Sequence, residues 1–552
     1  MNKLRQIFSF SEDTPLLFTQ IDFWIFFALA YFIFALLYAK KHLRSAYLFA
    51  VSLLFYYKTS GLFIGILLFS TLNDFFIGRA IYKSSSQIFK KILVSISVVI
   101  NLATLCYFKY AYFFTDAYNH MFHTKYEVFN YLAHWANSFS DSNYFNASSI
   151  ILPVGISFYT FQTISYSVDI YRKQLKPLNS ILDFGFFVSF FPQLVAGPIV
   201  RAADFVPQIH KPTLIRKKDF GKGVYLILKG LIKKMIFADF IAMSFLDRVF
   251  DAPELFSGFT NIIAMIGYSL QIYGDFSGYT DIAIGLALLM GFVLPKNFNA
   301  PYKAIHCGDF WKRWHISLST WLKDYLYIPL GGNQKGSYAS YILTGILMGG
   351  FLFAQQNATL SIIILCILLW LTVMALLFKK VHTHINTNIN ILLTMLIGGL
   401  WHGASWKFVI WGGLNGLGIL TYKYWRLISP YESSNHKLVR VWKIFLTFLF
   451  ITFTRIFFRG NSMEHIAIFF RQIAQNMDIQ NALALLWEYR WVFTVMLLGY
   501  ITHWQSDALK QKIEHLFINS HFIIKGALAI VVTILCYQTY AADFQPFIYF
   551  QF

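Results

Sequence analysis

Two histidines are placed where their side chains could do chemistry, and His402 is the first. It lies within residues 398–406 (GGLWHGASW), inside an otherwise apolar segment. A neutral imidazole shielded from lipid can accept a proton from a hydroxyl group and later return it, as acyl transfer requires. The alternative is a core histidine hydrogen-bonded to a neighbouring helix. Because ionisable groups inside apolar spans are usually functional, the sequence favours the catalytic role.

The residues around His402 predict a closely packed helix. The glycines on either side of it allow two helices to approach each other. If the segment is helical throughout, Trp406 lies one turn after His402 on the same face. Trp401 and Trp406 are then expected to support the imidazole as neighbours.

His315 is the second candidate, within residues 309–323 (DFWKRWHISLSTWLK). Helical spacing predicts one apolar stripe, made of Phe310, Trp314, Leu318, Trp321 and Tyr325. It predicts a polar stripe beside it, made of Lys312, His315, Ser319 and Lys323. One interpretation is an amphipathic helix at the membrane surface, and spacing alone favours it. The other is a donor site in which Lys312, Arg313 and Lys323, with Trp311 and Trp314, attract the phosphates of a nucleotide-like donor.

Two acids interrupt the apolar stretch 262–294. Asp275 and Asp281 flank the run FSGYT. An uncompensated acid at the bilayer centre costs roughly 2.5 kcal/mol or more, so each must form an ion pair, cap a broken helix or face water. We expect them to brace the structure around the site rather than to catalyse, and we expect the helix to break near them.

The elements that must position these residues are membrane helices. Hydrophobic residues make up 57% of the 552 positions and charged residues 13%, about half the share in soluble proteins. Charge-free runs of bilayer length occur at residues 23–39, 92–108, 337–354, 360–378 and 526–542. The polar N-terminus, residues 1–14, does not resemble a cleavable signal peptide.

The net charge of +20 does not indicate nucleic-acid binding. Lysine and arginine form short clusters beside the apolar runs, which is the pattern of cytoplasmic loops. Four cysteines, Cys106, Cys307, Cys366 and Cys536, lie far apart and form neither a metal-binding spacing nor a disulfide framework. No phosphate-binding loop, zinc-protease helix or hydrolase nucleophile motif occurs, so we expect no bound metal.

Loop charges predict the sidedness of the spans and reveal an irregularity. The basic segment 83–91 should be cytoplasmic and the nearly base-free segment 115–148 external. Both 172–176 and 201–222 are basic, although one apolar segment, 181–200, lies between them. A re-entrant hairpin broken at Pro192, Gly197 and Pro198 would keep both basic segments inside. Irregular backbone at this depth must line a cavity or lie within protein, so we expect broken helices around an internal chamber. We find no internal repeat and treat residues 1–552 as a single membrane domain.

Several motifs resemble the membrane-bound O-acyltransferase family, in particular its bacterial polysaccharide branch. They are residues 152–162 (LPVGISFYTFQ), 191–201 (FPQLVAGPIVR), 275–281, 310–332, Trp401-His402-Gly403 and 546–552 (PFIYFQF). The resemblance covers the chain almost from end to end. It implies an all-α polytopic fold, a ring of tilted transmembrane helices with re-entrant segments around a central tunnel. His402 matches the family's catalytic histidine and His315 its second characteristic position.

The resemblance also implies a reaction and its partners. The donor is an acyl thioester, acetyl-CoA or an acyl carrier, approached from the cytoplasm, and no cofactor is permanently bound. The acetyl group passes outwards to an extracytoplasmic polysaccharide, such as an alginate-like polymer or peptidoglycan. A separate partner with an SGNH, serine-hydrolase-like fold completes the transfer. The expected location is the bacterial inner membrane, in contact with its lipid.

One segment departs from the family pattern. Residues 333–393 separate the turn at Gly331-Gly332 from the Trp-His-Gly motif and include two spans. We interpret this segment as an inserted hairpin, which we expect to pack at the periphery. Outside acetyl transfer, the sequence leaves open D-alanyl or other acyl transfer from a carrier protein. A transporter or a non-catalytic scaffold of a polymer-export complex is also open, although a transporter's paired halves are not evident.

Overall fold

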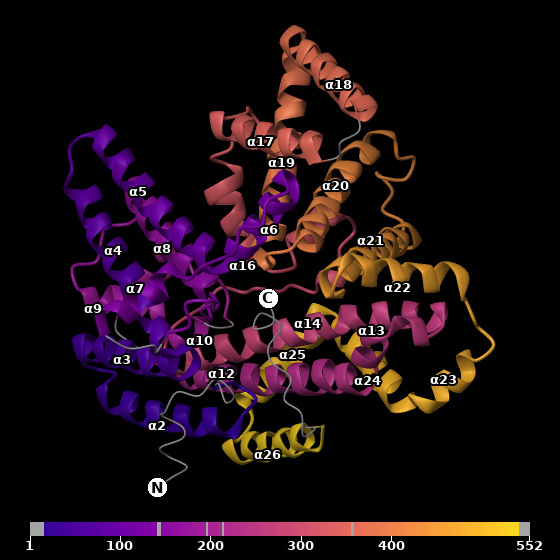
Figure 1. Ribbon diagram of the computed structural model, residues 1–552. Helices are drawn as coiled ribbons and strands as arrows, with labels where there is room; N and C mark the ends of the chain where they lie inside the picture. Colours follow the sequence, from indigo (N-terminus) through magenta and orange to yellow (C-terminus); the bar gives the residue numbers. More distant parts are fainter. Residues whose placement is uncertain (1–15, 141–144, 195–196, 212–214, 355–357, 540–552) are drawn as a thin grey trace.

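Every regular element in the described parts of the chain is a helix, as the sequence predicts (Figure 1). The computed structural model describes residues 16–140, 145–194, 197–211, 215–354 and 358–539. The polar N-terminus at 1–14 and the motif at 546–552 lie outside these ranges.

Within the described ranges, five helical segments are long and apolar enough to cross a bilayer. They are Lys41–Lys83, Gln87–Phe122, Thr359–Leu377, Lys437–Arg459 and Phe522–Thr539. Two helices that meet at 86°, Ala482–Glu488 and Arg490–Trp504, form a sixth candidate if they count as one broken span. A span needs about 20 residues because a helix rises 1.5 Å per residue. The chain is therefore a multi-pass membrane protein.

Most of the N-terminal helices gather on the left of Figure 1, and α6 reaches the centre of the molecule. They are α2 (Ile21–Leu37), α3 (Lys41–Ser60), α4 (Ile64–Lys83), α5 (Gln87–Leu105), α6 (Ala111–Phe122), α7 (Tyr131–Ser140), α8 (Ile156–Tyr171), α9 (Ile181–Ser189), α10 (Phe191–Leu194) and α11 (Ala202–Ile209). One π-helical turn, Cys106–Tyr110, joins α5 to α6. The predicted break in residues 181–200 is confirmed, because α9 ends at Ser189 and is only nine residues long. At 1.5 Å per residue it is too short to cross a bilayer.

Two helices lie along each other at the centre of the molecule, α12 (Lys217–Leu231) and α14 (Gly258–Leu289) (Figure 1). They touch backbone to backbone at glycines. A Cβ atom added to Gly230 would lie 2.6 Å from the carbonyl oxygen of Gly278, and one added to Gly285 would lie 2.7 Å from that of Gly223. Any larger residue at these positions would push the helices apart.

The expected break at Asp275–Asp281 is wrong, because α14 continues through both acids for 32 residues. Lysines on the neighbouring segment neutralise the acids. Lys234 Nζ lies 2.5 Å from Asp275 and 2.7 Å from Asp239. Asp281 is paired with Lys233 at 2.7 Å and with Lys229 at 3.2 Å. The irregular backbone occurs instead in the lysine-bearing segment, which widens into π-helix at Ile232–Phe240 and Ala242–Leu246.

The segments that carry the histidines follow α14. They are α15 (Cys307–Trp311), α16 (Ile316–Leu322), α17 (Tyr338–Ala354), α18 (Ala358–Leu377), α19 (Lys379–His402) and α20 (Trp406–Ile428). Of the two spans of the segment 333–393, α18 projects at the top of Figure 1 and α17 lies below it, and both contact α19. Side chains on α18 are largely exposed, as expected of a surface that faces lipid.

The remaining helices close the lower and right sides of Figure 1. They are α13 (Asp247–Asp251), α21 (Lys437–Arg459), α22 (Met463–Gln475), α23 (Ala482–Glu488), α24 (Arg490–Trp504), α25 (Asp507–Asn519) and α26 (Phe522–Thr539). Of these, α21 packs against both α14 and α20 and so reaches the region around His402.

Candidate active site

His402 is the last residue of α19 and is 3% exposed. Its ring centroid lies 5.0 Å from that of Trp411 on α20 and 5.4 Å from that of Phe458 on α21. The predicted close approach of helices is confirmed at Gly399. A Cβ atom there would lie 2.3 Å from the carbonyl oxygen of Phe408 and 2.9 Å from Gly412. This contact brings α20, and with it Trp411, against the imidazole.

The predicted position of Trp406, one turn after His402 on the same helix face, is wrong. Helix α19 ends at His402, Gly403 and Ser405 are extended, and Trp406 begins α20. Trp406 is 58% exposed, and its ring contacts Phe113. Only glycine fits at position 403, because the ring of Phe408 leaves no room for a Cβ atom there.

His315 is fully buried and adopts an unusual backbone conformation. Its φ is 46° and its ψ is 52°, in the left-handed region that His adopts more readily than most non-glycine residues. The single predicted helix over 310–325 is therefore wrong: α15 ends at Trp311, and α16 begins after His315. Nor does the apolar stripe face lipid, because Phe310, Trp314 and Leu318 are buried within the protein.

Asn297 fixes both the turn and the protonation of His315. Its Oδ1 accepts from the backbone N–H of Ser317 at 3.1 Å and lies 3.2 Å from Nδ1 of His315. Because the Ser317 N–H can only donate, the atom facing it must be the amide oxygen. That oxygen cannot donate, so Nδ1 of His315 carries the proton in this hydrogen bond. Nε2 then keeps the lone pair and is the nitrogen able to accept a proton.

The two histidines lie together at the end of α19. Their ring centroids are 6.2 Å apart, and the ring of His315 is 6.0 Å from that of Trp401. Trp401 is packed against Phe161 of α8 at 5.4 Å. Elements separated by more than 80 residues of sequence thus converge on one buried pair of imidazoles.

Lys109 holds the end of α19 in place. Its Nζ donates to the carbonyl oxygens of Trp401 at 2.7 Å and His402 at 3.3 Å. The hydroxyl of Tyr110 donates to the carbonyl oxygen of Leu400 at 3.0 Å. The last carbonyl groups of a helix have no partner inside it and attract cations. The π turn at Cys106–Tyr110 brings both donors to this position. Sequence reasoning missed Lys109, although a lone lysine within an apolar span is a signal of such a role.

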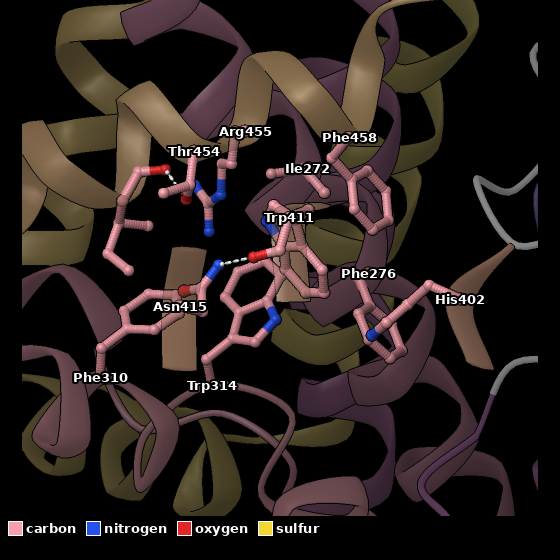
Figure 2. A pocket seen from close by; sticks show the side chains of 11 residues that line it. Ile272, Phe276, Phe310, Trp314, His402, Trp411, Asn415, Thr454, Arg455 and Phe458 are labelled. Carbon is pink, nitrogen blue, oxygen red and sulfur yellow. Dashed lines mark hydrogen bonds between the residues drawn. The ribbon is translucent and has the colours of Figure 1, made fainter. Parts of the chain in front are cut away.

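A small cavity, ≈ 10 Å³ in volume, opens beside His402. That volume suits about one water molecule. Its lining comes from α14, α15, α19, α20, α21 and the turn after α15, and includes Phe276, Trp314, Trp411, Asn415 and Arg455 (Figure 2). A donor can enter only if aromatic side chains move. Sequence reasoning also missed Asn297, Asn415 and Arg455.

The other candidate residues are not all brought to this cavity. Trp314 lines it, and the ring of Trp311 lies 5.6 Å from that of Trp411. Arg313 is paired with Asp309 at 3.0 Å, while Lys312 and Lys323 are exposed. Ser319 is half-buried, and its hydroxyl donates to the carbonyl oxygen of Trp314. The predicted polar stripe does not form, because His315 turns inward and the two lysines do not.

Removing the amino group of Lys109 is expected to weaken the site without unfolding the protein. In Lys109→Met, the end of α19 loses both hydrogen bonds from Lys109 and keeps only the one from Tyr110. A hydrogen bond from a charged donor contributes roughly 1.5–3 kcal/mol at most, so the loss is limited. We expect acyl transfer to fall about tenfold at saturating donor, with Lys109→Arg intermediate. Steady-state kinetics on reconstituted protein measure this, with the exposed Lys91→Met on α5 as the control. Equal activity in Lys109→Met and Lys91→Met would show that His402 is held in position without Lys109.

The fold and the site define the class as a multi-pass membrane enzyme with its candidate catalytic groups buried at the end of a helix. The chain belongs to the membrane-bound O-acyltransferase family, MBOAT, whose profile matches residues 93–347. It is thus an acyltransferase. The matched region includes His315 and ends before His402.

Similar proteins come from several bacteria. A probable alginate O-acetylase of Azotobacter vinelandii is 33% identical over 404 residues, 73% of this chain and 66% of that protein. A peptidoglycan O-acetyltransferase of Helicobacter pylori is 31% identical over 455 residues, 77% of this chain and 73% of its own length. A teichoic acid D-alanyltransferase of Bacillus subtilis is 27% identical over 329 residues, covering 57% and 71%. The chain spans about two thirds of the length of the Azotobacter protein.

Proposed function

We propose that this protein moves an acetyl group from a cytoplasmic thioester, acetyl-CoA, towards a polysaccharide outside the cytoplasmic membrane. The observation that carries the proposal is the buried pair of imidazoles, 6.2 Å apart, with His402 open to a cavity. Similarity to O-acetylases of alginate and peptidoglycan supports the acetyl group and the class of acceptor.

His402 acts as the general base in this proposal. It accepts the proton of the acceptor hydroxyl while the hydroxyl oxygen attacks the carbonyl carbon of the thioester. The carbon–sulfur bond then breaks, and the proton passes from the imidazole to the leaving thiolate. One acetyl ester and one free thiol are formed. His315, with its lone pair on Nε2, assists as a second proton acceptor or as a hydrogen-bond partner of His402's substrate.

The arrangement of the chain and its partners follows from the same proposal. Residues 1–552 form one membrane domain, and residues 333–393 are a hairpin inserted at its periphery. The donor needs no permanently bound cofactor. A separate extracytoplasmic partner with an SGNH, serine-hydrolase-like fold delivers the acetyl group to the polymer. The surface lysines 312 and 323, with Arg313, lie on the donor side and meet the phosphates of CoA as it enters.

A transfer assay with labelled acetyl-CoA tests the proposal. Membranes containing the protein and its partner should move the label from acetyl-CoA to alginate or peptidoglycan, in a form that mild alkali releases as acetate. Membranes without the protein are the control. Label that stays entirely in the donor, while an acylated carrier protein is consumed, would favour carrier-dependent transfer. If neither acetyl-CoA nor the acylated carrier protein is consumed, the result would favour a transporter or a scaffold.

A further inference from the structure

Arg455 is a buried cation in the same cavity as His402. It lies on α21 and is 3% exposed. Its guanidinium carbon stands 4.6 Å above the ring of Trp314 and 5.0 Å from that of Tyr302. Nη1 donates to the carbonyl oxygen of Ser269 at 3.3 Å and to the hydroxyl of Tyr302. These contacts fix the guanidinium plane but leave its charge unpaired.

In the described part of the chain, no carboxylate lies within ion-pair distance of Arg455. The acids on the neighbouring helices have other cations: Asp275 is paired with Lys234 at 2.5 Å and Asp247 with Arg459 at 3.1 Å. Arginine remains protonated in proteins, so this site keeps a positive charge. The charge lies among aromatic rings, where screening by water is weak.

Arg455 lines the cavity and keeps one nitrogen without a hydrogen-bond partner in the described structure. Nη2 is buried without a hydrogen-bond partner in the described structure, and so is Oδ1 of Asn415. Both side chains line the cavity that His402 lines, and Figure 2 shows Arg455 extending from its helix towards Asn415. An acyl group presented to His402 therefore occupies a cavity that already contains a full positive charge.

This charge discriminates between acyl groups. An acetyl group is neutral, whereas a D-alanyl group carries an α-ammonium below about pH 7.7. Two like charges about 6 Å apart, at an effective dielectric constant of about 20, repel each other enough to change a binding constant roughly 100-fold. A neutral acyl group suffers no such penalty, and an anionic one would be attracted.

We propose that Arg455 selects the acyl cargo by charge, admitting neutral or anionic acyl groups and rejecting amino-acyl groups such as D-alanyl. The proposal rests on the function proposed above, because it concerns the thioester that His402 attacks. It makes Arg455 a specificity residue for the acyl group, a role separate from proton transfer by His402.

Three thioesters of nearly equal size test the proposal: isobutyryl-CoA, lactyl-CoA and D-alanyl-CoA. They differ only in carrying a methyl, a hydroxyl or an ammonium group on the same carbon. Purified protein in nanodiscs is incubated with each at pH 6.5, with water as the acceptor, so that each turnover releases one acid and one CoA thiol. Thiol release gives kcat/KM for each donor, and acetyl-CoA is the reference. We expect D-alanyl-CoA to be used about 100-fold less well than isobutyryl-CoA, and lactyl-CoA within about fivefold of isobutyryl-CoA.

Variants then assign the discrimination to Arg455. In Arg455→Met, the ratio of kcat/KM for isobutyryl-CoA to kcat/KM for D-alanyl-CoA should fall at least tenfold. Arg455→Lys should preserve this ratio. Arg440→Met, at an exposed position on the same helix, should leave it unchanged. An unchanged ratio in an active Arg455→Met protein would overturn the proposal. If that variant does not fold, equal rejection of lactyl-CoA and D-alanyl-CoA by the wild type would overturn it, because polarity would then be the cause. Thiol release from none of the four donors would instead overturn the proposed function itself.

Discussion

His402→Ala is expected to lower acetyl transfer by about 10²–10⁴-fold while the protein still folds and inserts, because a positioned general base contributes about that factor. His402 ends α19 and packs on Trp411 and Phe458 beside the cavity. Its removal leaves the acceptor hydroxyl without a proton acceptor. Transfer of labelled acetyl groups by protein reconstituted at equal amounts measures the effect.

One control and one further variant separate chemistry from folding in this experiment. His384 lies on the same helix, α19, and its side chain is exposed, so His384→Ala should retain full activity. His315→Asn should keep the left-handed turn, which Asn tolerates, and lose activity through the missing imidazole nitrogen. Thermal unfolding of each variant must match the wild type within a few degrees. A well-folded His402→Ala protein that acetylates its polymer at the wild-type rate would show that His402 is not the base.

Lys234→Met is expected to destabilise the protein by about 3–5 kcal/mol, because it removes the cation from the buried Asp275 and the half-buried Asp239. Lys234 is 1% exposed and bridges Asp239 and Asp275, on two different segments. A methionine of similar length fills the space but supplies no charge. Titration of unfolding in mixed micelles, followed by tryptophan fluorescence, measures the loss.

The matched changes identify charge as the cause. Lys218→Met on the exposed end of α12 should leave stability unchanged within about 0.5 kcal/mol. Adding Asp239→Asn and Asp275→Asn to Lys234→Met should recover much of the loss, since no uncompensated carboxylate then remains. If the triple variant is no more stable than Lys234→Met, packing rather than charge explains the effect.

The features that could be predicted from the sequence are those encoded locally. Charge-free runs of bilayer length became helices, and the break at 181–200 followed from loop charges and Pro192. Gly399 predicted a close contact, because a missing side chain is visible in the sequence and its packing consequence is general.

The turn at His315 could not be predicted in the same way. The apolar residues before and after it keep helical spacing, because both short helices pack into the same interior. Periodicity records which side chains are buried and does not detect a change of direction between them. No glycine marks the left-handed residue, and Asn297, which stabilises it, lies 18 residues away.

The partners of the buried charges could not be predicted from the sequence either. An acid in an apolar segment demands compensation, but nothing in the sequence says that Lys233 and Lys234, some 40 residues earlier, provide it. Lys109 and Arg455 could have been flagged as lone cations in spans, since such residues are costly there. Their targets, the end of α19 and the cavity, are defined only by the packing of distant helices.

The ion pairs between α12 and α14 also constrain how the chain is inserted during synthesis. A lysine or an aspartate at the centre of a helix costs about 2.5–3.5 kcal/mol when the translocon releases that helix to lipid. Lys229 and Lys233 emerge from the ribosome well before Asp281, their common partner. Released to lipid alone, the first segment would expose both lysines, so we expect it to stay in a polar environment until α14 has been made. A chain that ends before Gly258 would lack α14 and leave these lysines without Asp281, so we expect it to be unstable.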